Sequence, residues 1–273
     1  MVSGPIVKFV LTAALRDKLV TTFVLLLVVA SSLSIFLGSA TVTEQEQFAM
    51  VYSAGAMRFL GAICVILFTC FYIRRAFESK EVEFLLSRPI SRLDYVLSHA
   101  VAFGVISFVI ALVISGVVLA TGQPDIFGWA LWGTSLLVEF VILSIVALFF
   151  SMVLSSAAGA ALACFAVYAL ARMMGVILGI SAVPVGGTMT LVLGHIVELI
   201  SIFIPRLDLM GQTSWLIYGA DTVQHYDVDR FASSWSRSII ENTGVIWFIV
   251  AQGIVFSSFL IVCTVFDFVR KQF

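Results

Sequence analysis

The chain has 273 residues, of which 61% are hydrophobic and only 11% charged, and its formal net charge is -1. Soluble domains carry about a quarter of charged residues, so this composition excludes an ordinary soluble enzyme. It also excludes a nucleic-acid-binding protein, because no basic surface is available outside the flanks of the apolar runs. We expect one all-α transmembrane domain over residues 1–273, embedded in the lipid bilayer.

The first predicted element is an amphipathic helix over residues 4–18 that lies on the membrane surface. Lys8, Thr12 and Arg16 recur every four residues, and apolar residues fill the positions between them. This spacing turns the polar residues to one face, toward lipid headgroups. The alternative is a frayed cationic flank without a defined face.

Six segments are then predicted to span the membrane, because each is apolar and long enough to cross the hydrocarbon core. They cover residues 19–40, 49–73, 95–121, 127–153, a stretch ending near residue 180, and 244–268. Pro184, Gly186 and Gly187 break the helical pattern after the fifth. We expect an extracytoplasmic cap over residues 183–242, with residues 188–204 forming an interfacial or re-entrant helix.

The basic residues predict the orientation of these spans. With six spans and a cytoplasmic N-terminus, ten lysines and arginines lie inside and three outside, namely Arg206, Arg230 and Arg237. A seventh span over residues 188–204 would move Arg270 and Lys271 outside and reduce this bias. We therefore predict that both termini are cytoplasmic.

The one long charged segment between apolar runs covers residues 74–94. Its cations and anions are Arg74, Arg75, Lys80, Arg88 and Arg92, and Glu78, Glu81, Glu83 and Asp94. So many charges must face water, and the predicted orientation puts them in the cytoplasm. We expect this segment to contact a cytoplasmic partner.

Glu78 and the following LLSRPISR run, residues 85–92, resemble the cytoplasmic coupling segment of ATP-binding-cassette (ABC) transporter permeases of the type-2 exporter family. Lys80-Glu81 stands where that family usually has Gly-Thr, and Ser98-His99 where it has Gly-Lys. The order of spans is similar more loosely, including to permeases that serve copper-enzyme maturation.

The resemblance implies a transport function in a plasma membrane, the inner membrane of a bacterium. Two permease copies, or this chain and a paralogue, would form the translocation path and bind two separate P-loop ATPase subunits. Glu78, Glu81, Arg88, Pro89 and Arg92 would make the ATPase contacts. ATP would bind to the partner, since this chain has no G-x-x-x-x-G-K-[ST] motif, and we expect no catalytic residue and no cofactor here.

Three charges fall inside the predicted spans, where a charged side chain is costly: Arg58, Glu139 and Arg172. At 1.5 Å per residue they lie roughly 12–18 Å from the outer ends of their spans. We expect Glu139 to pair with Arg172 or Arg58, with Arg172 preferred as the closer neighbour across a tight turn. The alternative is that both arginines reach outward and Glu139 is protonated.

Two other functions remain open from the residues alone. Arg58, Glu139 and Arg172 could form an ion path in an ATPase-independent secondary transporter or channel. A permease-like subunit could also pass motion to an extracytoplasmic partner held by the cap. His195 and Glu198 share a helical face, but two ligands are too few for a metal site, and we expect none.

Overall fold

The computed structural model describes residues 2–39, 45–87, 90–181, 188–218, 239–240 and 242–270. These residues form helices and no β-strand. Six of the helices are long and apolar enough to cross a membrane, as predicted. They are α2 (Lys18–Ser39), α3 (Gln45–Glu78), α5 (Arg92–Thr121), α6 (Ile126–Val153), α7 (Ala157–Ser181) and α13 (Val245–Arg270). The chain therefore has the architecture of a multi-pass membrane protein.

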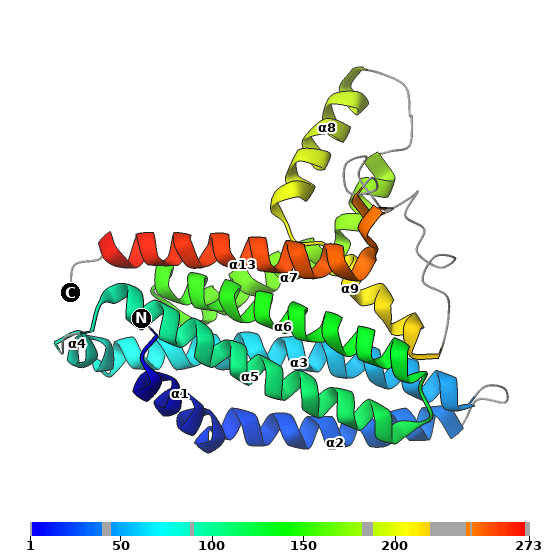
Figure 1. Cartoon of the computed structure of the whole chain (residues 1–273), viewed down its shortest axis with the longest axis horizontal. Coiled ribbons are helices and arrows are strands. Elements are labelled where there is room, and N and C mark those ends of the chain that lie inside the picture. The colour runs from blue at the N-terminus through cyan, green and yellow to red at the C-terminus, as the bar shows by residue number, and fades with distance from the viewer. Residues whose placement is uncertain are drawn as a thin grey trace.

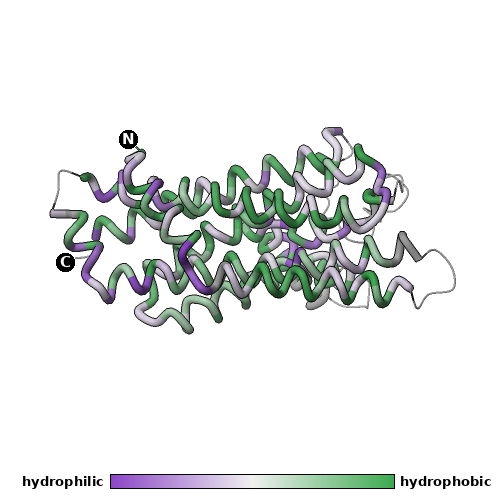
Figure 2. Tube along the Cα trace, turned by 90° about the horizontal axis from the view of Figure 1, so that it is seen from below, coloured by the Kyte–Doolittle hydropathy of each residue, from purple (hydrophilic) through white to green (hydrophobic). Residues whose placement is uncertain are grey.

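The long helices run side by side, and the two chain ends lie at the same end of the bundle (Figure 1). That end also carries the short helix α4 (Glu81–Leu86), and we call it the α4 end. Hydrophobic residues dominate the length of the helices, and hydrophilic residues gather near the two termini (Figure 2). This distribution is the one that a bilayer around the middle of the bundle requires.

Helix α6 is the centre of the bundle and packs against α3, α5, α7 and α13. It is apolar on all sides, which is typical of a helix surrounded by other helices. Trp132, Leu136, Phe140 and Ala147 are fully buried along it. The position of Glu139 near its midpoint therefore places a carboxylate in the interior of the protein.

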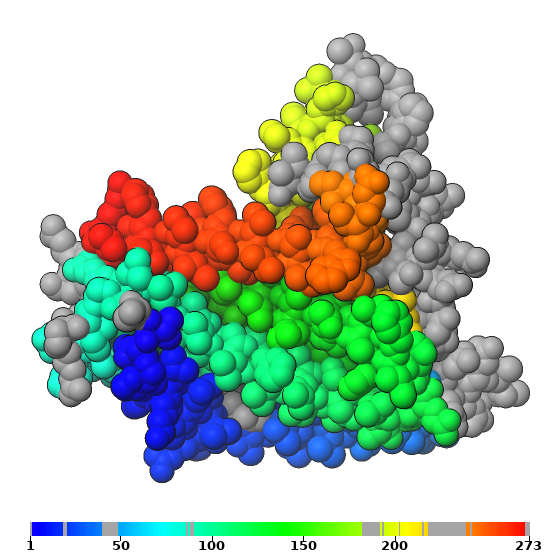
Figure 3. All heavy atoms as spheres, viewed as in Figure 1, coloured from blue at the N-terminus to red at the C-terminus, as the bar shows by residue number. Residues whose placement is uncertain are grey.

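Helix α1 (Gly4–Arg16) lies across α5 near the α4 end, as Figure 3 shows. Ile6, Val10 and Ala14 form its buried face, and the backbone N–H of Ser3 donates to Ser98 Oγ at 2.8 Å. Lys8 is exposed on the opposite side. The predicted amphipathic character is present, and the apolar face is covered by protein.

The chain after α7 first leaves the bundle and then returns to it. Helix α8 (Thr188–Phe203) leaves at a steep angle to the long helices (Figure 1). Pro205 follows it, and α9 (Leu207–Gln212) and the 3-10 helix η1 (Thr213–Tyr218) then pack against α6 and α7. Their apolar side chains, Leu207, Leu209, Met210 and Ile217, are buried in the core.

Residues 207–218 belong to the predicted extracytoplasmic cap over residues 183–242, whose later part is polar and aromatic without a long apolar run. In the structure they pack against α3, α6 and α7, and their apolar side chains join the core. Residues 219–238, the remainder of the predicted cap, lie outside the described residues.

Candidate functional site

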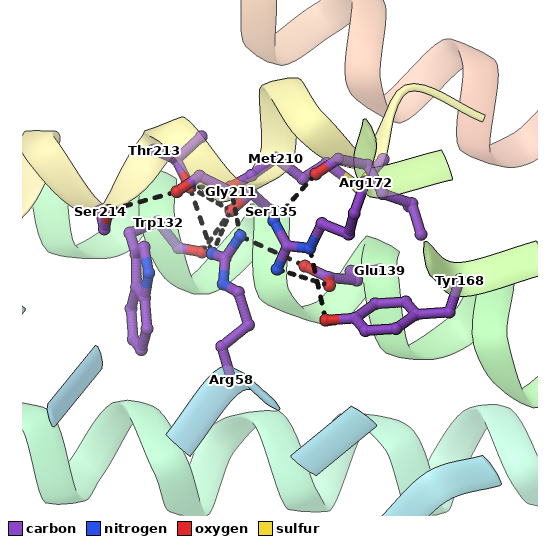
Figure 4. Close-up of polar contacts among 11 residues, drawn as sticks. Arg58, Trp132, Ser135, Glu139, Tyr168, Arg172, Met210, Gly211, Thr213 and Ser214 are labelled. Carbon is purple, nitrogen blue, oxygen red and sulfur yellow. Dashed lines mark hydrogen bonds and ion pairs between the residues drawn. The ribbon is translucent and has the colours of Figure 1, made fainter. Parts of the chain in front are cut away.

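The three charges inside the predicted spans meet in one buried network (Figure 4). Arg58 of α3 approaches Glu139 Oε2 at 3.2 Å, and Arg172 of α7 approaches Glu139 Oε1 at 3.0 Å. Glu139 therefore pairs with both arginines at once, where the sequence predicted one or the other. Each carboxylate oxygen accepts a hydrogen bond from one guanidinium, and such charge-assisted hydrogen bonds stabilise a carboxylate that is shielded from water.

Because this network is buried, its ion pairs are needed to offset the free-energy cost of removing the charges from water. The Arg58 and Glu139 side chains are 3% and 0% exposed, and that of Arg172 is 25% exposed. A buried ion without a partner loses hydration without compensation, whereas a well-paired one recovers most of that cost. Arg58 and Glu139 therefore depend on each other more than Arg172 depends on either.

The same two arginines also bind the inserted segment. Arg172 Nη1 donates to the carbonyl of Leu207 at 3.0 Å, and Arg58 Nη1 donates to the carbonyl of Met210. A Cβ atom at Gly211 would collide with the Arg172 guanidinium, so glycine permits this close approach. The network thus fastens α9 to three spanning helices.

Neutral side chains complete the hydrogen bonding. Arg58 Nη2 donates to Ser135 Oγ at 2.9 Å and to Thr213 Oγ1 at 3.2 Å, and these two hydroxyls lie 2.7 Å apart. Each guanidinium also faces an aromatic ring, Arg58 over Trp132 at 5.5 Å and Arg172 over Tyr168 at 5.6 Å, a cation–π geometry.

Sequence reasoning missed these neutral partners. Ser135 lies one helical turn before Glu139 on α6, and that spacing could have indicated it. Thr213 and the carbonyls of Leu207 and Met210 carry no such signal, because their contribution depends on the insertion of α9 and η1.

A second buried ion pair lies at the start of α9. Arg206 donates to both carboxylate oxygens of Asp208, from Nε at 2.9 Å and from Nη2 at 2.6 Å. The side chains are 1% and 8% exposed. The orientation argument counted Arg206 among the three cations on the outer side of the membrane. In the structure this guanidinium is buried and paired, so it does not lie free at the surface.

The predicted coupling segment lies at the α4 end. Glu78 is the exposed last residue of α3, and Glu81 opens α4 after Lys80, whose φ of 58° is left-handed. Val82 is buried and anchors α4, while Phe84 is 60% exposed. Burial raises the pKa of Glu81 above its ordinary value. Helix α4 thus presents both charge and an aromatic ring at the surface.

Two arginines of the segment donate hydrogen bonds to carbonyls at the ends of other helices. Arg74 Nη1 donates to the carbonyl of Leu154 at the end of α6, at 3.4 Å. Arg92 Nη1 donates to the carbonyls of Phe268 and Val269, the last turn of α13, at 3.1 and 3.0 Å. Helix C-termini favour cations in this position. Of the remaining predicted contacts, Arg88 and Pro89 lie outside the described residues.

A groove of about 380 Å³ separates α1 from α4. Its walls are mainly apolar, and Glu81 and His99 add polar groups. The lining residues are Ser3, Pro5, Ile6, Phe9, Glu81, Phe84, Leu85, Ile90 and His99. The α4 end therefore combines a concave apolar surface with exposed charges.

Within the described ranges, no three histidines, cysteines or carboxylates are grouped as metal ligands. His195 and Glu198 both lie on α8. A comparison with protein-family models finds no match for this chain, and a comparison with curated proteins finds none either. The function is therefore inferred from the geometry of the chain itself.

Proposed function

We propose that this chain is the transmembrane subunit of an ABC exporter, coupled through its α4 end to separate P-loop ATPase subunits. The observation that carries this proposal is α4 itself. It is a short helix between two spanning helices, beside the surface helix α1 and at the end where both termini lie. Such an element can receive motion from a partner and pass it to α3 and α5.

The contacts of α4 fit this mechanical role. Val82 fixes the helix to the bundle, whereas Glu78, Lys80 and Phe84 are exposed. Apolar anchors surrounded by charges are typical of a docking surface, with charges setting the orientation of the partner. Two copies of the chain would form the translocation path, with ATP bound by the partner.

The ion network supports a structural role within such a subunit. Arg58 and Glu139 are buried, and both terminal nitrogens of Arg58 donate hydrogen bonds, to groups of α6 and α9 among others. This arrangement favours a structural brace, which makes the outer half of the bundle move as one rigid body. It disfavours an open ion path. The alternative of a secondary transporter would require Glu139 to change partners during transport.

Affinity purification from native membranes in mild detergent tests the proposal. We expect a P-loop ATPase to co-purify with the chain and to be lost from the Phe84→Asp variant. The matched control is Phe127→Asp, since Phe127 is 73% exposed in the first turn of α6, and α6 begins at the end of the bundle opposite α4. Absence of any P-loop protein, under conditions that preserve a known transporter complex, would overturn the assignment.

A further inference from the structure

The groove between α1 and α4 is formed by elements that the rest of the protein holds in place. The backbone N–H of Ser3 donates to Ser98 Oγ at 2.8 Å, which holds the start of α1 against α5. On the other side, the buried side chain of Val82 holds α4. The groove has a volume of about 380 Å³, near the lower limit for small-molecule pockets. It therefore suits a small polar group with a few carbon atoms.

Glu81 supplies a carboxylate to this groove. Its side chain is partly exposed, so a ligand in the groove can reach it. None of the described residues forms an ion pair or a side-chain hydrogen bond with this carboxylate. Burial raises its pKa, and no neighbouring cation offsets that effect. Because a partly buried carboxylate without a partner costs free energy, the groove favours a ligand that brings a positive charge.

The other groups of the groove also favour a cation. Phe9 of α1 and Phe84 of α4 line it, and their side chains are 53% and 60% exposed. The faces of aromatic rings attract ammonium groups. At the buried side of the groove, His99 Nδ1 lies 2.9 Å from the carbonyl oxygen of Tyr95. A carbonyl can only accept, so Nδ1 carries the hydrogen and Nε2 of the neutral ring is an acceptor. No lysine or arginine is among the described residues that line the groove.

The groove opens at the level of the membrane surface. Helix α1 exposes the apolar side chains of Phe9 and Leu15 as well as the cation of Lys8. An amphipathic helix with this combination is typical of the boundary between lipid headgroups and acyl chains. Since Phe9 also lines the groove, lipid headgroups are the ligands nearest to it.

We propose that this groove binds the headgroup of phosphatidylethanolamine from the leaflet at the α4 end. The ammonium group donates hydrogen bonds to the Glu81 carboxylate and lies against the rings of Phe9 and Phe84. A primary ammonium has three N–H donors, whereas a trimethylammonium has none, so the carboxylate selects ethanolamine over choline. The acyl chains stay in the bilayer beside α1. The bound headgroup joins α1 to α4 and does so whether or not an ATPase docks there.

The test compares phosphatidylethanolamine with its N-acetyl derivative on the purified, delipidated full chain. The two lipids share the phosphate, the glycerol and the acyl chains, but acetylation converts the ammonium group into an uncharged amide. Native mass spectrometry in mild detergent measures the affinity of each. We expect about tenfold tighter binding of phosphatidylethanolamine, the effect of one hydrogen bond to a charged group.

Two pairs of variants locate the site. Glu81→Gln keeps the size of the side chain and should remove the preference for phosphatidylethanolamine. Its matched control is Glu83→Gln, exposed on the same helix, which should keep the preference. Phe9→Ala should weaken phosphatidylethanolamine about two- to fivefold by removing one ring from the ammonium group. Leu15→Ala, at an exposed position of the same helix, should bind as the wild type does.

Equal affinity of the wild type for the two lipids would overturn the proposal, as would an unchanged preference in Glu81→Gln. A competition experiment identifies the source of the ammonium group. Glycerophosphoethanolamine, the soluble headgroup without acyl chains, should not displace the lipid at equal concentration. If it does, the groove takes a soluble amine and the lipid is the wrong ligand. If neither lipid binds and a photoreactive residue at position 9 crosslinks to a protein, the groove belongs to that protein instead.

Discussion

Replacing Glu139 by glutamine removes the one described carboxylate shared by two arginines while preserving the size of the side chain. Removing one partner of a buried ion pair typically costs about 3–5 kcal/mol of folding free energy. We take the lower value, because Arg172 is 25% exposed and Arg58 keeps neutral acceptors in Ser135 and Met210. For a chain of this size about 3 kcal/mol corresponds to a Tm lowered by roughly 6–12 °C.

Thermal unfolding in one detergent, followed by far-UV circular dichroism, measures this shift. Glu83→Gln on the exposed side of α4 is the matched control and should leave the Tm unchanged. The double variant Glu139→Gln, Arg58→Met should recover part of the loss, because it removes the stranded cation. A Tm for Glu139→Gln within about 2 °C of wild type would refute the ionic network.

The network also predicts the outcome of a charge swap. Exchanging the residues of the Glu139–Arg172 pair would place an arginine at position 139 beside Arg58. We therefore expect Glu139→Arg, Arg172→Glu to be no more stable than the single variants. Full rescue would show that Arg58 does not contact position 139.

Three further predictions follow from local geometry. Gly61→Ala should cost about 1–3 kcal/mol of stability by overpacking against Phe140, whereas Gly104→Ala, whose Cβ meets nothing within 4 Å, should not lower the Tm. Arg92→Ala should speed hydrogen exchange in the last turn of α13 about fivefold, since about 1 kcal/mol of hydrogen bonding to its carbonyls is lost; unchanged exchange would contradict this. Burial raises the pKa of Glu81, so the protonated form is favoured in the folded state. The contribution of protonated Glu81 to the packing of α4 against the bundle should be complete below pH 4.5. It should be lost as the pH rises through the raised pKa. Hydrogen exchange of α4 should show this pH dependence in the wild type but not in Glu81→Gln.

The spanning helices could be predicted because length and apolarity alone determine what a bilayer accepts. Residues 127–153 and α6, for example, differ by one residue at the start. The apolar span predicted to end at residue 73 is part of helix α3, which continues to Glu78, and Arg74 in this extension donates to the carbonyl of Leu154. Helix ends with such tertiary partners are not visible in composition.

The candidate site could be predicted only in part. The cost of burying Arg58, Glu139 and Arg172 indicated that they must find partners, and they do. The role of α9 could not be predicted, because its acceptors are backbone carbonyls, which every residue type supplies. The burial of Arg206 could not be predicted either. It depends on an ion pair with Asp208 inside a segment whose sequence is typical of a loop.

The most direct test of ATPase coupling is photocrosslinking from α4 in native membranes. A photoreactive phenylalanine analogue replaces Phe84 in one sample and Phe127, at the opposite end of the bundle, in the other. We predict a crosslink from position 84 to a P-loop ATPase, with a yield that changes when ATP is added, and none from position 127. No crosslink to a nucleotide-binding protein from position 84, or equal crosslinking from both positions, would contradict the assignment of α4 as the coupling helix.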